Sequence, residues 1–453
     1  MGPSFFHPPA GDSYALRSVR SPRCLVTGDA ALEPSGDGDL VALDLQIEQG
    51  RIAAIAPAGA LPPESGPDMR DALVLPGLVD LHTHLDKGHI WPRQSNATGD
   101  GAGATAATLR DRTANWHAAD VSARMDFALR TAYAHGVVAV RTHLDSQPPQ
   151  AGISFPVFRA MRERWAGRID LQVSSIAPLD IFQRDDGRQL ADTVAASGGQ
   201  LGCVTRSSQY PGDPMPPDLD AGLVQLFRLA KERGLDVDLH VDESTDPRAR
   251  TLIRVAQVAV RQGFPHRILC GHCTALALQT DEFIDETLSA CKEAGVAIVS
   301  LPTVNMYLQD RSDPAGRTPR WRGVTVLHEM KARGIEVAVA GDNCRDPFYA
   351  YGDHDMLDTY SQSVKILQLD HPFGDWIRAV SATPAAIMGL PGRGAIRVGA
   401  PADLIVVRAR SYSELLSRNQ FDRTVLRAGR AIDTTLPDYR ELDAVLGLES
   451  SAW

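Results

Sequence analysis

Residues 77–85 read GLVDLHTHL, a short apolar run that ends in two histidines separated by one residue. Apolar runs of this length, bounded by turn signals, are typical of buried β-strands. On a strand, His82 and His84 point to the same side, because alternate side chains share a face. In parallel α/β barrels, functional side chains gather at the carboxyl ends of the strands. The stretch therefore predicts a parallel strand with a functional carboxyl end.

Seven more strand candidates follow this one and alternate with amphipathic helical stretches such as 218–234 and 280–295. Eight strand–helix units over roughly 300 residues fit an α/β fold of the (β/α)8 TIM-like barrel type. The glycine-rich segment 99–112 is predicted to be an insertion after the first strand that forms an active-site loop or lid. The other strand candidates are 137–145, 170–178, 201–206, 235–243, 267–273, 296–304 and 335–343.

The two ends of the chain have a different pattern. Residues 14–75 alternate short strands with turn signals, and segments 399–411 and 423–433 have the same character. We expect both ends to pair into one small β-sandwich domain. The predicted domains are thus a composite β domain, residues 1–75 with 386–453, and a metal-dependent barrel, residues 76–385.

Composition narrows the class of protein. The 453 residues carry a net charge of −10, which argues against nucleic acid and favours a small-molecule partner. Six cysteines without repeated spacing indicate a reducing compartment, so we expect a cytoplasmic protein. The chain shows neither an export signal pattern nor an apolar run of about 18 residues, and no membrane association is expected.

Several strand candidates end in side chains that bind metals. His82 and His84 end the first strand, His240 lies near the end of the fifth, and Asp342 lies near the end of the eighth. Three imidazoles and a carboxylate at one barrel mouth would form a divalent-metal site with room for water. Glu243 comes three residues after His240, where a carboxylate can act as a general acid and base without being a ligand.

The motifs of the barrel form a specific set. They are VLPGLVDLHTHLDKGHI (74–90), VRTHLD (140–145), DLHVDE (238–243), CGHCTA (270–275), LPTVNMYLQDR (301–311), RWRGVTVLHEM (320–330), GDNCRDPFYAYG (341–352), SATPAAIMGL (381–390) and VGAPADLIVV (398–407). Together the motifs resemble the amidohydrolase superfamily and, within it, the cytosine deaminase-like group of metal-dependent hydrolases. The resemblance covers about residues 74–406.

The resemblance implies that the four ligands named above hold one divalent ion per chain, Zn²⁺ or Fe²⁺, which activates a water molecule. It implies that His272 orients this water, that Asp342 accepts its proton, and that Glu243 delivers a proton to a ring nitrogen. The implied activity is hydrolytic deamination of a small amino-substituted nitrogen heterocycle, such as a cytosine-like pyrimidine, with release of ammonia. Homo-oligomers are common in the family, so we expect one here.

Three departures from the cytosine deaminase pattern concern the substrate. Leu179 replaces a glutamine that reads the pyrimidine edge, Asn343 replaces a second aspartate, and Phe348 replaces a tryptophan. Losing the glutamine removes a hydrogen-bond pair used for discrimination, which argues against cytosine itself. The candidate substrate-binding residues are Leu179, Asn305, Asn343, Phe348, His143 and Asp86, with Lys87, Asp145 and Gln309 as further candidates.

Three alternatives remain at this point. Hydrolysis of an s-triazine amine or of a cyclic amide is the second enzyme hypothesis, although two-metal relatives use a carboxylated lysine on strand four and segment 201–206 has no lysine. A non-catalytic binding relative would be expected to lose ligands, whereas all are present here. The C-x-x-C of Cys270 and Cys273 suggests a redox dithiol, but it lies on the sixth of eight strands, so we expect His272 to carry the function.

Overall fold

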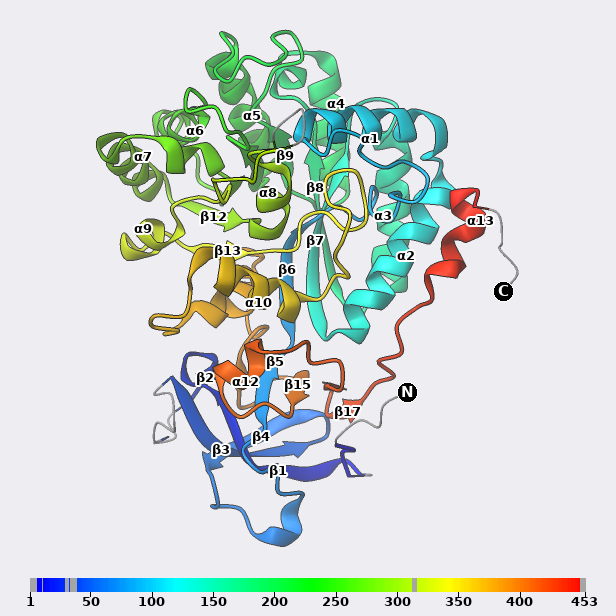
Figure 1. Ribbon diagram of the computed structural model, residues 1–453, viewed down its shortest axis with the longest axis vertical. Coiled ribbons are helices and arrows are strands. Elements are labelled where there is room, and N and C mark those ends of the chain that lie inside the picture. The colour runs from blue at the N-terminus through cyan, green and yellow to red at the C-terminus, as the bar shows by residue number, and fades with distance from the viewer. Residues whose placement is uncertain (1–5, 10, 29–31, 33–38, 312–315, 449–453) are drawn as a thin grey trace. The chain divides into compact units, whose positions relative to one another are not determined.

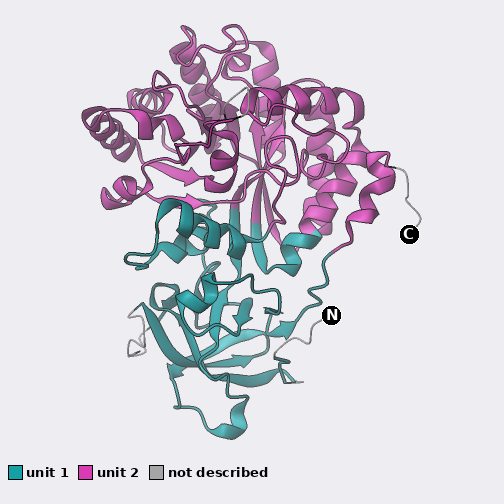
Figure 2. Ribbon diagram, in the orientation of Figure 1, with its two compact units in different colours: residues 1–80, 130–139, 355–436 teal, residues 81–129, 140–354, 437–453 magenta. Residues whose placement is uncertain are grey.

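The computed structural model describes residues 6–9, 11–28, 32, 39–311 and 316–448. Its contacts divide the chain into two compact units (Figure 2). Unit 1 contains Met1–Asp80, Arg130–Ala139 and Asp355–Leu436, and unit 2 contains Leu81–Leu129, Val140–His354 and Pro437–Trp453.

The predicted domains do not coincide with these units. Residues 437–448 were assigned to the β domain with the rest of the C-terminal segment, but they cluster with unit 2. There, Leu442 and Leu446 pack with Phe127. The division into 1–75 with 386–453 and 76–385 therefore stays a prediction, and its outermost residues, 1–5 and 449–453, lie outside the described part of the chain.

Unit 1 is built around a seven-stranded sheet that both ends of the chain share. β5 from the N-terminal part pairs antiparallel with β15 from the C-terminal part. The sheet therefore combines strands from both ends of the chain. In sheet order the strands are β17 (Arg430–Ala431), β16 (Thr424–Arg427), β15 (Leu404–Val407), β5 (Leu73–Pro76), β1 (Ser13–Pro22), β3 (Leu40–Glu48) and β4 (Arg51–Pro57).

A second layer covers the apolar face of this sheet. β2 (Val26–Thr27) and β14 (Ile396–Arg397) form a parallel two-stranded sheet. Val26 and Ile396 belong to the same buried cluster as Leu16, Leu43 and Leu45 of the large sheet. Burial of apolar side chains between the layers is the main source of stability for such a sandwich.

The strands predicted for the barrel are present and form a cyclic order. β6-β7-β8 form one sheet, and β9 to β13 form a second sheet in which all pairs are parallel. Parallel bridges Ser174↔Gln200 and Pro178↔Val204 join β8 to β9, and the bridge Thr83↔Asp342 joins the two outer ends. The strands are β6 (Leu78–Thr83), β7 (Val137–Asp145), β8 (Asp170–Ile176), β9 (Leu201–Val204), β10 (Val237–Val241), β11 (Ile268–His272), β12 (Val296–Ser300) and β13 (Val337–Val339).

Helices connect these strands and lie outside them (Figure 1). The structure thus confirms the predicted α/β class, and the closed strand order is that of a (β/α)8 barrel. The principal connecting helices are α1 (Gly101–Asn115), α2 (Ala118–Ala134), α3 (Ala151–Arg164), α4 (Asp185–Ala196), α5 (Leu219–Arg233), α6 (Thr251–Arg261), α7 (Asp281–Ala294), α8 (Pro302–Leu308) and α9 (Leu327–Ala332). After β13 come α10 (Met356–Leu367), α11 (Ala382–Ile387), α12 (Tyr412–Leu416) and α13 (Asp443–Leu446).

Two local predictions were wrong. The glycine-rich segment 99–112 is mostly helix α1, because the Asp100 side chain caps the Gly103 N–H at 2.8 Å and an alanine-rich run follows. The predicted strand 296–304 ends at Ser300, because Pro302 starts helix α8, where its missing N–H costs nothing.

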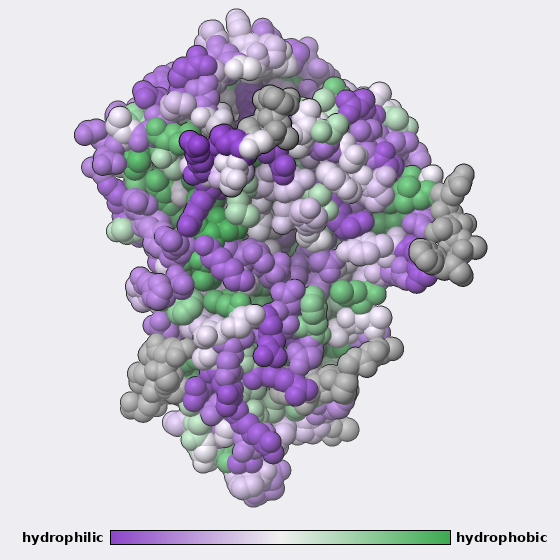
Figure 3. Space-filling view, viewed as in Figure 1, coloured by the Kyte–Doolittle hydropathy of each residue, from purple (hydrophilic) through white to green (hydrophobic). Residues whose placement is uncertain are grey.

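The surface agrees with the composition. Polar and apolar side chains are interspersed over the face seen in Figure 3. Among the described residues, the structure has no helix with the length and apolar character needed to cross a bilayer.

Candidate active site

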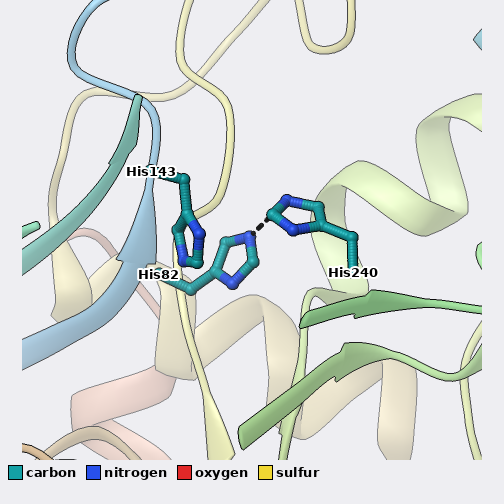
Figure 4. A group of neighbouring side chains, drawn as sticks. All are labelled: His82, His143 and His240. Carbon is teal, nitrogen blue, oxygen red and sulfur yellow. Dashed lines mark hydrogen bonds between the residues drawn. The ribbon is translucent and has the colours of Figure 1, made fainter. Parts of the chain in front are cut away.

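Three histidines from two strand ends converge inside unit 2. His82 lies on β6, His84 follows that strand directly, and His240 lies on β10. The Nε2 atom of His240 lies 3.2 Å from that of His82 and 3.3 Å from that of His84. Figure 4 shows the rings of His82 and His240 meeting edge to edge. The period-2 side-chain alternation of β6 places both of its histidines on this side, as the sequence predicted.

Asp342, which follows the last barrel strand β13, completes this group. Its N–H donates to the His82 carbonyl at 2.8 Å, and the Thr83 hydroxyl donates to the Asp342 carbonyl at 2.8 Å. Its Oδ1 lies 3.2 Å from His84 Nε2 and 3.6 Å from His82 Nε2. The residue has a left-handed φ of 60°, a strained conformation of the kind found at functional sites.

The four side chains fit a divalent cation. Burial, followed by neighbouring charged groups, holds the pKa of each of His82, His84 and His240 well below the usual value, so the imidazoles are neutral. Neither carboxylate oxygen of Asp342 has a hydrogen-bond partner within the described part of the chain. Two nitrogens about 2.0–2.1 Å from one tetrahedral ion lie about 3.3–3.4 Å apart, close to the spacing seen here. Burial raises the pKa of Asp342 to about 7 in the absence of a cation.

His143, predicted to contact substrate, lies against this group. Its ring centroid is 3.9 Å from that of His82 (Figure 4), and donor atoms of His82, His143 and His240 all lie within 4.8 Å of one another. His143 Nε2 is 3.8 Å from Asp238, which is itself paired with Arg141 at 3.0 Å. Burial raises the pKa of Asp238 to about 6 although Arg141 opposes the shift.

The two predicted proton-handling residues are joined by an amide. The Asn305 side-chain nitrogen lies 3.1 Å from Glu243 Oε1 and 3.0 Å from His272 Nδ1. His272 Nδ1 is 3.6 Å from the same Glu243 oxygen. Asn305, on α8, was predicted to bind substrate, whereas here it contacts the general-acid candidate and His272. His272 also has a left-handed φ, of 66°.

A second polar group surrounds Lys87. Its Nζ is 3.2 Å from Asp145 and lies 5.0 Å from the centroid of the Phe348 ring. Arg112 of α1 also pairs with Asp145 at 2.9 Å, and the Asp145 N–H donates to Asp86 at 2.9 Å. Burial acts to lower the pKa of Lys87, but three aspartates outweigh it, so the lysine is charged.

Burial, together with Asp145, raises the pKa of Asp86 to about 7. Of the remaining substrate candidates, Asn343 donates to Asp346 at 2.7 Å. Asp346 is fully buried, and burial raises its pKa to about 7 against the effect of Lys87. Leu179 lies apart from these residues, since its side chain packs against Gly222 on the outer helix α5.

Reasoning from the sequence missed three functional candidates. Arg112 was placed in a loop and is on a helix, so its reach to Asp145 was not visible. Asp346 and Asp238 carried usable signals: Asp346 follows Asp342 by four residues in one motif, and Asp238 precedes His240 by two and therefore shares its strand face.

The cysteines of the C-x-x-C lack the exposed, low-pKa thiol of a redox dithiol. Cys270 and Cys273 are fully buried and free. Burial raises the pKa of both thiols well above the usual value, which opposes thiolate formation. The motif therefore serves to place His272 at the end of β11.

Comparison with known proteins agrees with this chemistry. The chain is 49% identical over 450 residues to a pterin deaminase from Rhizobium rhizogenes, a match that covers 99% of this chain and 100% of the relative. It is 24% identical over 379 residues to an N-isopropylammelide isopropyl amidohydrolase from Pseudomonas sp., covering 81% and 87% of the two chains.

Solved structures share the fold. The 5-methylcytosine deaminase from Klebsiella pneumoniae, liganded with 5-fluorocytosine, superposes with a TM-score of 0.78 at 23% identity over 94% of this chain and 98% of that one. The N-isopropylammelide isopropylaminohydrolase from Burkholderia multivorans gives 0.72 at 25% identity over 94% and 100%. The family model described as "Amidohydrolase family" matches residues 175–431. The chain therefore belongs to the amidohydrolase family and is a hydrolase of non-peptide carbon–nitrogen bonds.

Proposed function

We propose that this protein is a hydrolytic deaminase whose substrate is a pterin, a fused bicyclic ring that carries an amino group on an amidine-like carbon. The observation that carries the proposal is the convergence of His82, His84, His240 and Asp342 beside Glu243. The 49% identity to a pterin deaminase along almost the whole chain supports the choice of ring.

The reaction exchanges an amine for an oxygen at one ring carbon. Water adds its oxygen to the carbon that bears the amino group, and one water proton moves to the adjacent ring nitrogen. The carbon–nitrogen bond to the amino group then breaks, the second water proton leaves with the amine, and the products are ammonia and the ring carbonyl. A divalent ion such as Zn²⁺ or Fe²⁺, held by the three histidines and Asp342, would lower the pKa of the water.

The side chains of this protein would move the protons. Asp342 would accept a proton from water, and Glu243 would deliver a proton to the ring nitrogen. The Asn305 amide, 3.1 Å from Glu243 and 3.0 Å from His272, would fix the positions of both side chains relative to each other. His272 would orient the attacking oxygen. Each transfer would then occur between groups held in place by the fold before substrate arrives, which reduces the entropic part of the barrier.

The polar groups around Lys87 would bind the substrate. A charged lysine beside the half-buried Phe348 ring offers a hydrogen-bond donor next to a flat apolar surface. Such a pair suits a planar ring with a carbonyl at its edge. The buried Asn343–Asp346 pair adds an amide and a carboxyl group that can read ring N–H and carbonyl positions. Leu179 would not take part, because it faces α5.

The proposal also extends to the state of the protein. We infer a homo-oligomer that works in a reducing compartment, the cytoplasm. Six free cysteines, five of them buried, support the compartment. Light scattering after size-exclusion chromatography measures the oligomer, and a monomer at micromolar concentration would contradict this part.

The test of the substrate is amine release by metal-loaded enzyme, measured as ammonia from pterin and cytosine and as isopropylamine from N-isopropylammelide. We expect kcat/KM for pterin to exceed that for cytosine by at least about 10⁴, because a site built for polar ring edges rejects analogues that leave its groups unpaired. Faster turnover of N-isopropylammelide than of pterin would favour the triazine alternative, and preferred turnover of cytosine would contradict the proposal.

The role of Glu243 has a separate test. Glu243→Gln should lower kcat about 10²- to 10⁴-fold and leave the metal content unchanged, since the side chain moves a proton and holds no metal. Glu282→Gln, at an exposed acid on α7, is the matched control and should keep wild-type kcat. Wild-type turnover by Glu243→Gln would remove Glu243 from the mechanism.

A further inference from the structure

A second group of buried metal-binding side chains lies in unit 2. His89 lies six residues after β6, and Cys344 and His354 lie on the segment that follows β13. The three side chains are 1%, 4% and 8% exposed, and donor atoms of all three lie within 4.8 Å of one another. None of the three belongs to the proposed catalytic centre.

His89 lacks the partners that a buried imidazole needs. Neither of its ring nitrogens has a hydrogen-bond partner within the described part of the chain. A buried polar group without a hydrogen-bond partner destabilises the folded protein. Burial, followed by His354, Arg345 and Arg124, holds the pKa of His89 well below the usual value, so the ring is neutral and keeps a free lone pair. A cation is a natural partner for such a lone pair.

Cys344 supplies the sulfur of the group. The thiol is buried and forms no disulfide. A divalent metal ion displaces a thiol proton on binding, and the proton leaves to solvent.

The backbone holds these side chains in place before any ligand binds. The His89 N–H donates to the Cys344 carbonyl at 3.0 Å, and the Trp91 N–H donates to the Arg345 carbonyl at 2.8 Å. His89 and His354 both adopt left-handed φ values, of 66° and 50°. Such backbone strain persists only where the surroundings fix it, and it is common at ligand sites.

The C-terminal segment covers the group. The Tyr439 ring stacks on Phe127 at 5.6 Å between centroids and lies 6.4 Å from the His89 ring. Its hydroxyl donates to Asp353 at 3.0 Å. A metal ion at this position would therefore lie under the C-terminal segment of the chain itself.

We propose that His89, Cys344 and His354 bind one Zn²⁺ ion, separate from the proposed catalytic centre. Two imidazole nitrogens and one thiolate are ligands that zinc prefers, and a water molecule would complete the tetrahedron. The ion would fix the segment that follows Asp342 against residues 88–91 and support the surface under Tyr439.

Cobalt loading tests this site by a signal that the proposed catalytic ligands cannot give. Metal-free full-length protein is titrated with Co²⁺, and bound metal and the thiolate-to-cobalt charge-transfer absorption are measured. We expect two Co²⁺ per chain with the thiolate band in the wild type. Cys344→Ser should bind one Co²⁺ and lose the band, because serine does not provide a thiolate.

Two controls separate the sites. Cys273→Ser changes a buried thiol outside the group and should keep two ions and the band. Asp342→Asn should lose one ion and keep the band; a wild type with one ion and the band would mean that only the catalytic centre is wrong. If Cys344→Ser fails to fold, the Co²⁺ titration of the wild type and that of His89→Gln, which also removes one of the three ligands, still test the proposal. Absence of the band from the wild type, or its survival in Cys344→Ser, overturns the proposal.

Discussion

In unit 1 the buried carboxylate of Asp355 is fully paired, whereas in unit 2 the buried carboxylate of Asp342 faces histidine rings that donate no hydrogen bond to it. Asp355 accepts from the Arg423 guanidinium at 2.8 and 2.6 Å and from the Leu357 N–H at 3.0 Å, with His135 at 3.6 Å. Asp342 has close approaches from His82 and His84 at 3.6 and 3.2 Å.

The difference separates stability from function. Burying a charge destabilises the folded protein unless an opposite charge and hydrogen bonds compensate for it. A buried charge that is compensated in this way, here called matched, needs no further ligand. Buried donors and acceptors without partners destabilise the ligand-free protein, and they are available to bind a ligand. On this view the His82–Asp342 centre gains stability from its ligand, and the Asp355–Arg423 pair gains none.

The largest effect is expected from a substitution in the unmatched centre of His82, His84, His240 and Asp342. Asp342→Asn should lower kcat about 10³-fold or more, since it removes the anionic ligand and the proton acceptor. The free energy of unfolding of the metal-free variant should equal or exceed that of metal-free wild type, because an unpaired buried charge is gone. Urea denaturation of both metal-free proteins measures this. A loss of 3 kcal/mol or so would show that Asp342 is matched after all.

The next largest effect is expected from a substitution in the matched Asp355–Arg423 pair. Arg423→Met should lower the free energy of unfolding by about 3–5 kcal/mol, because it leaves the Asp355 carboxylate buried and unpaired. The kcat of the folded protein should stay at the wild-type value, since neither residue belongs to the active site.

An exposed ion pair of unit 1 provides the control for this change. Arg430 and Asp12 are paired at 2.5 Å with side chains 73% and 70% exposed. Arg430→Met should cost at most about 1 kcal/mol in the same urea titration, because exposed pairs are screened by water. Equal losses for the two variants would contradict the distinction between matched burial and surface pairing.

The pH dependence of the Asp355–Arg423 pair is a smaller effect than the loss of Arg423. Burial acts to raise the pKa of Asp355, but Arg423 and His135 outweigh it and hold the pKa at about 2, below the ordinary 3.8. The pair's contribution is therefore complete above the ordinary pKa and is lost as the pH falls from about 4 to about 2. That contribution is about 2 kcal/mol. The difference in free energy of unfolding between wild type and Arg423→Met should therefore shrink as the pH falls from about 4 to about 2. A difference that stays constant over this range would contradict the assignment.

Reasoning from the sequence reached the main parts of the site because their signals are local. His82 and His84 share a face through the alternation of one strand, and His240 and Asp342 were placed by the rule that barrel strands end at one mouth. The same rules could not place Leu179, whose side chain packs against Gly222 of helix α5, because it lies in a turn beyond the end of β8.

The sequence by itself determined the eight strands, the histidine and aspartate set and the pairing of both chain ends in a β domain, since strand periodicity and strand-end position are written in neighbouring residues. Tertiary structure alone decided that Asn305 links Glu243 to His272 and that His89 meets Cys344 and His354. These partners lie tens to hundreds of residues apart along the chain. Contacts across such separations depend on turns, left-handed residues and packed helices that no local pattern specifies.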